Sequence, residues 1–151
     1  MSQRPGLSRR SFLQQAAAAG VFAPAVARWT LAAPPSGKVR HASFGANGMA
    51  WADLRAIMTH PNVDLVCVAE VDLARADKVR EEFPNCHVYQ DWREMLDKEG
   101  DNLDSCNVST PDHMHAPMAM SAMNRGLHVY GQKPLTHDVY ESRRLAQVAA
   151  E

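Results

Sequence analysis

Residues 44–54 read FGANGMAWADL, and they follow directly on the apolar run VRHASF at 39–44. A short apolar run, a turn with two glycines and a stretch with helical apolar spacing follow one another here. This order is typical of the first strand, turn and crossover helix of a parallel sheet. The stretch therefore predicts a strand–helix unit with a tight turn at its centre.

The turn resembles, in degraded form, the G-x-G-x-x-G pattern of dinucleotide-binding units. Gly45, Asn47 and Ala50 occupy the three glycine places, and Gly48 and Met49 lie between them. The first place needs a tight turn, the second lets the backbone approach a pyrophosphate, and the third lets helix and strand pack closely. Gly45 suits the first place fully, whereas Asn47 adds bulk and Ala50 nearly suits the third. By itself the pattern is equally compatible with a plain strand-to-helix turn.

Short apolar runs alternate with longer amphipathic ones along the rest of the chain. Four further strands are expected at 64–71, 87–89, 103–109 and 127–131. Helices are expected to begin near Met49, Leu73, Asp91, Met114 and Thr136. Five such repeats predict an α/β fold, a Rossmann-like doubly wound parallel sheet of about five strands over residues 38–151.

An acidic residue at the end of the second expected strand supports a dinucleotide site. Glu70 lies 25 positions after Gly45, roughly where a Rossmann unit carries the acid that binds the adenosine ribose. A carboxylate there accepts hydrogen bonds from the ribose hydroxyls and repels a 2′-phosphate. Glu70 therefore favours NAD over NADP. Arg75 keeps NADP open, although it reads more simply as a solvated helix residue.

The N-terminus is typical of an export signal. Arg9 and Arg10 lie in SRRSFLQ, which resembles a twin-arginine signal, and an apolar stretch follows that is too short to span a bilayer. We expect a signal peptide and linker at 1–33, with cleavage after Ala27 or, as the alternative, near Ala32 or Ala33. The twin-arginine translocase is the expected partner. We expect a periplasmic or otherwise exported protein with no stable membrane anchor. An ordinary amphipathic helix is the alternative.

Charge and cysteine content exclude other classes. Of the 16 basic residues, Arg4, Arg9 and Arg10 precede position 27, which leaves 13 against 17 acidic residues and a net charge of −4. Without a basic stripe, nucleic-acid binding is not expected. The three cysteines have no C-x-x-C spacing, so neither a disulfide framework nor a zinc site is expected, and Cys67 and Cys106 read as small buried hydrophobic residues.

A longer stretch resembles a known family. NVSTPDHMHAPMAMSAMNRGLHVYGQKPL at 107–135 is similar to the part of the Gfo/Idh/MocA oxidoreductases in which a TP motif follows the fourth strand and an EKP motif ends the fifth. The similarity extends back to the glycine turn and covers nearly all of 38–151. Two features depart from the family pattern, namely the turn at Asn47 and Ala50 and Gln132 in place of the glutamate.

The resemblance implies functions for several residues. Ser109, Thr110 and Pro111 would line the nicotinamide side of the cleft. His115, which matches the histidine after the family's TP turn, could reach a ribose or the substrate, and Gln132 would keep a hydrogen-bonding side chain in place of the family's glutamate. The alternating His113 and His115 also suggest a zinc pair, but a third ligand is missing, so no metal is expected.

Lys133 is the catalytic candidate that the resemblance implies. A cation beside the nicotinamide and the substrate hydroxyl can polarise a developing alkoxide while hydride moves. A lysine at the edge of the sheet, with Pro134 as a simple turn residue, is the structural alternative.

The family's second domain, which usually supplies the acid–base residues, is absent from this chain. We therefore expect a fragment of an NAD-dependent oxidoreductase that acts on a small sugar-like substrate or polyol, inactive alone, with homo-oligomers left open through the absent domain. Two alternatives remain, an NAD-dependent glycoside hydrolase of the same family and an inactive nucleotide-binding module.

Overall fold

A five-stranded parallel sheet forms the centre of the computed structural model, which describes residues 37–151. Its strands are β1 (Val39–Phe44), β2 (Val63–Ala69), β3 (His87–Tyr89), β4 (Ser105–Val108) and β5 (His128–Gly131). The spatial order is β3-β2-β1-β4-β5, and each neighbouring pair is parallel. This confirms the predicted Rossmann-like doubly wound sheet. The predicted signal peptide and linker lie outside the described residues.

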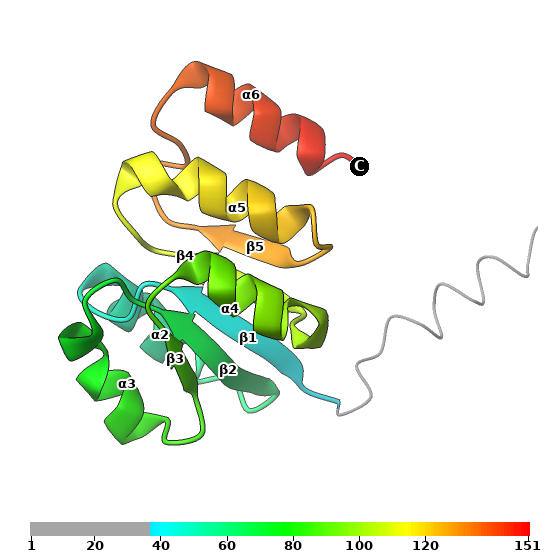
Figure 1. Ribbon diagram of the computed structural model, residues 1–151. Helices are drawn as coiled ribbons and strands as arrows, with labels where there is room; N and C mark the ends of the chain where they lie inside the picture. The colour runs from blue at the N-terminus through cyan, green and yellow to red at the C-terminus, as the bar shows by residue number, and fades with distance from the viewer. Residues whose placement is uncertain (1–36) are drawn as a thin grey trace, which may run out of the picture. The chain divides into compact units, whose positions relative to one another are not determined.

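Helices cover both faces of the sheet (Figure 1). On one face lie α4 (Trp92–Glu99) and α5 (His115–Met123), and α6 (Val139–Val148) packs on α5. On the other face lie α2 (Met49–Ile57) and α3 (Asp77–Glu82). Three short 3-10 turns complete the described part, η1 (Leu73–Ala76), η2 (Gly100–Asn102) and η3 (Asp112–Met114). Each helix therefore buries one apolar face against the strands or a neighbouring helix.

Aspartate caps set several helix starts. The side chain of Asp91 accepts a hydrogen bond of 2.8 Å from the N–H of Arg93 at the start of α4, and Asp138 accepts one of 2.8 Å from Glu141 in α6. Such caps satisfy backbone donors that have no partner within the helix. The last helix begins at Val139, after its cap, and not near Thr136 as predicted.

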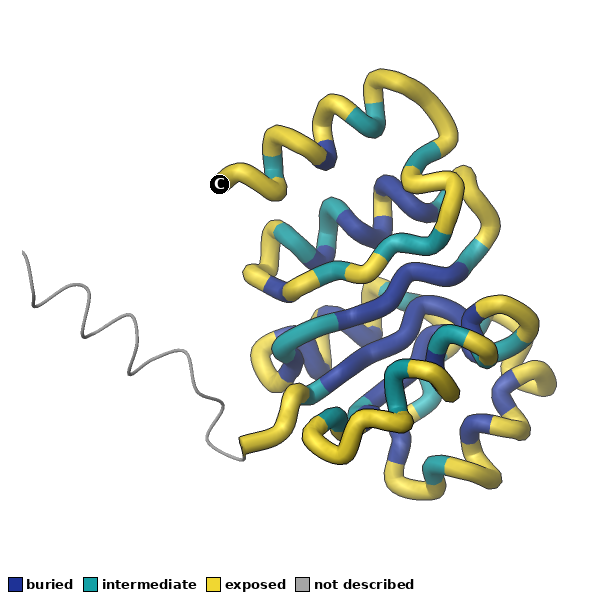
Figure 2. Tube along the Cα trace, turned by 180° about the vertical axis from the view of Figure 1, so that it is seen from behind, coloured by how far each residue is buried: buried dark blue, intermediate teal, exposed yellow. Residues whose placement is uncertain are grey.

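Two buried clusters lie on the two faces of the sheet, and Figure 2 shows buried residues concentrated along the central strands. Phe44 and Met95 are fully buried on the α4–α5 side, and Leu54 and Val79 on the α2–α3 side. The methionines of α5 belong to the first cluster, as predicted from their spacing. The two clusters fix which side of each strand faces which helices.

The cysteines are buried and free, as expected for small hydrophobic residues. Burial raises the pKa of Cys86 and of Cys106 to about 12, and burial also raises the pKa of Cys67. All three thiols therefore stay protonated at neutral pH.

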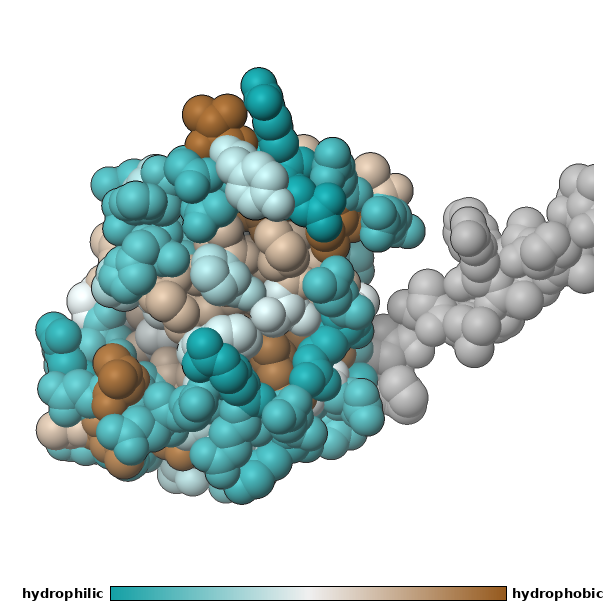
Figure 3. Space-filling model, turned by 45° about the horizontal axis from the view of Figure 1, so that its top comes forward, coloured by the Kyte–Doolittle hydropathy of each residue, from teal (hydrophilic) through white to brown (hydrophobic). Residues whose placement is uncertain are grey.

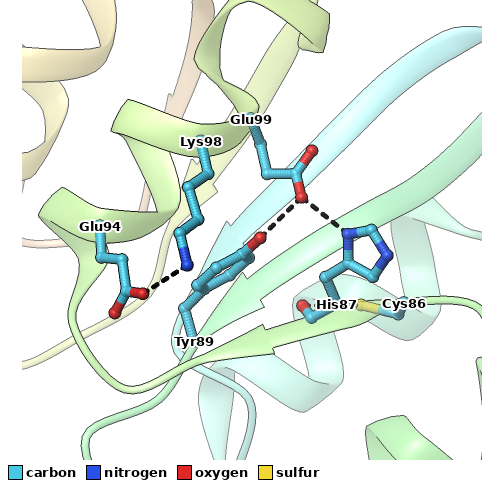
Figure 4. A network of polar contacts seen from close by, with 6 residues as sticks. All are labelled: Cys86, His87, Tyr89, Glu94, Lys98 and Glu99. Atoms are coloured by element: carbon cyan, nitrogen blue, oxygen red, sulfur yellow. Dashed lines mark hydrogen bonds and ion pairs between the residues drawn. The ribbon is translucent and has the colours of Figure 1, made fainter.

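A buried carboxylate joins α4 to the edge strand β3 (Figure 4). Glu99 is 9% exposed, and its Oε1 accepts hydrogen bonds of 2.7 Å from both His87 Nδ1 and the Tyr89 hydroxyl. Burial raises the pKa of Glu99, but the hydrogen bonds from Tyr89 and His87 outweigh it and lower that pKa overall. Burial, then the hydrogen bond to Glu99, raises the pKa of Tyr89 to about 12. The short strand β3 is thus anchored to the helix that follows it.

On the face shown in Figure 3, strongly apolar side chains appear as separate small groups among hydrophilic ones. Within residues 37–151, no helix combines the length and apolar character needed to cross a membrane.

Candidate functional site: a cavity at the carboxyl ends of the strands

A cavity of about 800 Å³ opens where the strands of the sheet end. In the sheet, β2 and β3 lie on one side of β1, and β4 and β5 lie on the other. The connections that follow the adjacent strands β1 and β4 therefore run in opposite directions. Open parallel sheets bind ligands in the crevice at this point. The lining comes from four segments that follow strands, plus Met118 of α5: Gly45, Asn47, Ala69, Glu70, Val71, Arg75, Gln90, Asp91, Trp92, Arg93, Glu94, Ser109, Thr110, Pro111, His113, Met114 and Met118.

The glycine turn after β1 depends on the absence of a side chain at Gly45. Its φ is 102°, and a Cβ there would lie 2.9 Å from both the carbonyl oxygen of Ser109 and the Cβ of Ala50. Only glycine allows this backbone conformation together with so close an approach. Gly45 therefore brings the turn after β1 against the end of β4.

The start of α2 is open to a ligand. Gly48, with φ 58°, is the cap residue and provides no side-chain hydrogen bond to the helix. Asn47 Oδ1 accepts a hydrogen bond of 2.8 Å from the N–H of Gly48, so the asparagine stabilises its own turn. Met49 is 53% exposed and lies outside the cavity lining. Uncapped N–H groups at a helix start favour an anion such as a pyrophosphate.

Glu70 follows β2 directly, and its side chain contacts the glycine turn after β1. Its Oε2 accepts a hydrogen bond of 3.2 Å from the N–H of Ala46, and its Oε1 accepts one of 3.2 Å from Asp72. Each carboxylate oxygen retains a second lone pair, so both can still accept a hydroxyl. Arg75 lines the same cavity. The cavity thus contains the predicted ribose-binding acid and also the arginine that the sequence left as a solvated residue.

The start of α4 contributes a wall that sequence reasoning missed. Trp92 lies edge-on to Phe44 at 6.1 Å between ring centroids, and the guanidinium carbon of Arg93 lies 4.4 Å from the centre of the Trp92 ring. Both residues line the cavity. Their position soon after the third expected strand could have indicated this wall, because ligands of parallel sheets bind at the carboxyl ends of the strands.

The turn after β4 lies across the cavity from Glu70 along the strand order. Ser109, Thr110 and Pro111 line the cavity. The Ser109 hydroxyl donates a hydrogen bond of 2.7 Å to Asp53 Oδ2 in α2, and the Thr110 hydroxyl contacts Met118 Sδ at 3.5 Å. Their hydroxyl groups thus already have partners in the protein.

His115 links two turns and lies outside the cavity lining. It is 2% exposed, and its two ring nitrogens lie 2.6 Å from the carbonyl oxygens of Pro134 and Thr110. Neither nitrogen is free for a metal. Within residues 37–151, no group of three histidine, cysteine or acidic side chains could hold a metal ion.

Gln132 and Lys133 follow β5, also outside the lining. The Gln132 amide contacts the Asp53 carboxylate at 3.0 and 3.2 Å, and its Oε1 accepts a hydrogen bond of 2.8 Å from the N–H of Lys133. The Lys133 side chain is exposed. Its catalytic role stays a prediction.

The residues present fit a dinucleotide. The cavity has the volume of an ordinary ligand site, and Gly45 provides a surface without a side chain beside the open start of α2. Glu70 supplies acceptors at one end. These are the features that a pyrophosphate and a ribose need.

Comparison with known proteins agrees with this geometry. Residues 39–151 match the model of the oxidoreductase family with an NAD-binding Rossmann fold, named GFO_IDH_MocA. The chain belongs to the Gfo/Idh/MocA family. The match covers every strand and helix of the described part.

Individual relatives carry the names of sugar, inositol and glycoside enzymes. The dTDP-3,4-didehydro-2,6-dideoxy-alpha-D-glucose 3-reductase of Streptomyces antibioticus is 36% identical over 106 residues, 68% of this chain and 30% of the enzyme. Inositol 2-dehydrogenase 4 of Saccharopolyspora erythraea is 35% identical over 88 residues, 57% of this chain and 25% of the enzyme. Glycosyl hydrolase family 109 protein 1 of Shewanella sp. is 28% identical over 128 residues, 79% of this chain and 28% of that protein.

A 3-ketoreductase of Actinomadura kijaniata, solved in complex with NADP and TDP-benzene, has a similar structure. The TM-score is 0.65 at 29% identity, covering 75% of this chain and 34% of the reductase. The chain spans about a third or less of the length of these relatives.

Of the cofactor-binding residues predicted for this family member, the cavity brings six together, Gly45, Asn47, Glu70, Ser109, Thr110 and Pro111. The others, Gly48, Met49, His115 and Gln132, lie outside its lining, as does Lys133.

Proposed function

We propose that this chain is the NAD-binding domain of an exported oxidoreductase that transfers hydride between the nicotinamide cofactor and a sugar or polyol. The observation that carries the proposal is the cavity at the divergence of β1 and β4, where Gly45 lets the turn approach Ser109. The names of the 3-reductase and the inositol dehydrogenase support the substrate class.

The residues of the cavity divide between the two halves of the cofactor. Glu70 would bind the adenosine ribose, and the open start of α2 would bind the pyrophosphate. The nicotinamide half would then lie on the side of β4, beside Ser109, Thr110 and Pro111. When bound, the nicotinamide accepts or supplies the hydride.

Cofactor preference rests on Glu70. A carboxylate at this position accepts from both ribose hydroxyls and repels a 2′-phosphate, which supports NAD over NADP. Two observations favour NADP instead: Arg75 lines the same cavity, and the similar 3-ketoreductase was solved with NADP. The carboxylate is fixed by two backbone N–H groups, so it is held in place for this discrimination.

Lys133 is the proposed catalytic residue. It follows directly on Gln132, whose side chain accepts the Lys133 N–H, and His115 contacts the carbonyl oxygens of both Pro134 and Thr110, so this backbone lies beside the turn after β4. An ammonium group there would stabilise negative charge that develops on a substrate oxygen.

A second candidate function is glycoside cleavage that uses a bound nicotinamide cofactor transiently. The similarity to glycosyl hydrolase family 109 protein 1 favours it. An inactive nucleotide-binding module would bind the same cofactor without turnover.

The test starts with the full-length protein, purified and denatured. We expect NAD to be released, and a preparation that neither carries nor binds a nicotinamide cofactor would rule out both enzymatic functions. Net NADH formation with free sugars or polyols supports the dehydrogenase. Cleavage of aryl glycosides without net reduction supports the glycosidase.

Export is proposed from SRRSFLQ alone. Cell fractionation should find the protein in the periplasm, and replacement of both Arg9 and Arg10 by lysine should retain it in the cytoplasm. An unchanged distribution would remove the twin-arginine route from the proposal.

A further inference from the structure

A directed chain of hydrogen bonds runs behind the cavity between β1, β4 and α2. Asn107 is fully buried, and its Nδ2 donates a hydrogen bond of 2.9 Å to Ser109 Oγ. Its Oδ1 lies 3.0 Å from His41 Nε2, which must therefore carry the proton. Burial lowers the pKa of His41, so the ring is neutral and its Nδ1 accepts from the Ser105 hydroxyl at 2.9 Å. Every donor in this chain points toward Ser109.

The chain ends on the carboxylate of Asp53. The Ser109 hydroxyl donates a hydrogen bond of 2.7 Å to Asp53 Oδ2. From the other side, Gln132 Nε2 donates to both carboxylate oxygens at 3.0 and 3.2 Å. The amide orientation of Gln132 is fixed, since its Oε1 must accept the N–H of Lys133. Both residues thus present hydrogen atoms to Asp53, as a negatively charged acceptor requires.

The Asp53 carboxylate lies behind Ser109, which lines the cavity. Asp53 is half-buried, its hydrogen bonds come from a neutral hydroxyl and a neutral amide, and Ser109 separates it from the cavity. Lys133, which follows β5, is exposed, so water screens its charge more strongly. The carboxylate consequently keeps much of its field at the β4 side of the cavity.

We propose that Asp53 determines which oxidation state of the nicotinamide cofactor the domain prefers. The inference rests on the proposed function, which assigns the nicotinamide half to the β4 side. The oxidised nicotinamide ring carries a positive charge that the reduced ring lacks. A fixed carboxylate behind Ser109 therefore favours NAD⁺ over NADH without touching either.

The experiment measures dissociation constants of NAD⁺ and NADH for the 151-residue chain by calorimetric titration at low salt. A unit charge at a partly screened site changes the affinity for an opposite charge by roughly five- to tenfold. We expect Asp53→Asn to weaken NAD⁺ relative to NADH by roughly this factor. Asp101→Asn is the matched control, because Asp101 is exposed and precedes β4, at the amino ends of the strands and away from the cavity.

A double variant separates charge from packing. In D53N/Q132E the carboxylate moves to position 132 and the amide moves to position 53, so the pair again carries one negative charge. The ratio of the two dissociation constants should therefore return toward the wild-type value. If Asp53→Asn weakens both forms equally, or if the double variant leaves the ratio as in the single variant, Asp53 is only structural and the inference is overturned. If wild type binds neither form, the proposed function fails with it. If Asp53→Asn does not fold, the single variant Gln132→Glu decides. A second carboxylate beside Asp53 should favour NAD⁺ over NADH further, and an unchanged ratio would overturn the inference.

Discussion

Replacement of Gly45 by alanine tests whether the close approach of the glycine turn to β4 organises the cavity. The new methyl group would lie 2.9 Å from a backbone oxygen of Ser109 and from Ala50 Cβ, and the backbone would keep φ at 102°. A backbone conformation of this kind costs a non-glycine residue about 1–3 kcal/mol, and overpacking costs about 1–3 kcal/mol more. We therefore expect Gly45→Ala to lower the free energy of unfolding by about 3 kcal/mol or more.

Gly48→Ala is the matched control. Gly48 also has a positive φ, of 58°, but a Cβ there would meet nothing within 4 Å. Its φ of 58° and ψ of −120° lie in a region that residues with a Cβ disfavour, so the substitution should cost only this backbone term, about 1–3 kcal/mol. The difference between the two variants isolates the contact with β4.

Urea denaturation of the 151-residue chain measures both variants. With a slope of about 1.5 kcal/mol per molar, the Gly45 variant should lose about 1 M more in midpoint than the Gly48 variant. Equal midpoints would show that the approach of the turn to Ser109 relaxes freely, and the reasoning about the cavity wall would fail.

Three further substitutions test the remaining arguments. Because the folded-state pKa of Glu99 is lowered, the stability that Glu99 contributes is present above about pH 4.5 and is lost as the pH falls. Glu99→Gln should lower the free energy of unfolding by about 1 kcal/mol at pH 7 and flatten its dependence on pH in acid. Parallel curves of unfolding free energy against pH for the variant and the wild type would refute this. Glu70→Ser should raise the affinity for NADP about tenfold, unlike the control Glu81→Gln; equal effects would discount the proposed repulsion. Lys133→Ala should lower turnover of the full-length enzyme by about a hundredfold or more with NAD retained, whereas Lys78→Ala should not; unchanged turnover would exclude the proposed role.

The fold was predictable because its signals are local and repeated. Each expected strand exists, but the end of β2 shows what a single sequence cannot decide. Val71 continues the apolar run, yet β2 stops at Ala69, where its pairing with Tyr89 of β3 also stops, and Val71 is 76% exposed. The partner strand sets that boundary, and a pattern within one run carries no information about the partner.

The second helix differs from its prediction for a related reason. The sequence predicts one helix from Leu73, whereas a 3-10 turn occupies Leu73–Ala76 before α3 begins at Asp77. The side chain of Asp72 accepts a hydrogen bond from the N–H of Ala74 and so shapes the tighter first turn. Apolar spacing does not distinguish the two helix types over four residues.

The cavity was predictable in part. Residues that directly follow β1, β2 and β4 were found from motifs, but Asp53 was not, since a lone acid on a helix normally reads as a solvated residue. Its importance depends on Ser109 and Gln132, which lie 56 and 79 positions away. Only the packing of α2 against β4 reveals that the three side chains meet.

The three buried thiols have a practical consequence for measurements on this domain. Alkylating reagents react with thiolates, and Cys67, Cys86 and Cys106 are the only cysteines in the chain. A single cysteine introduced at an exposed position, such as 133, would therefore take up a maleimide dye ahead of the native ones. The wild-type background can thus carry a site-specific fluorophore after the end of β5, and changes in its emission can be followed as nucleotide is added.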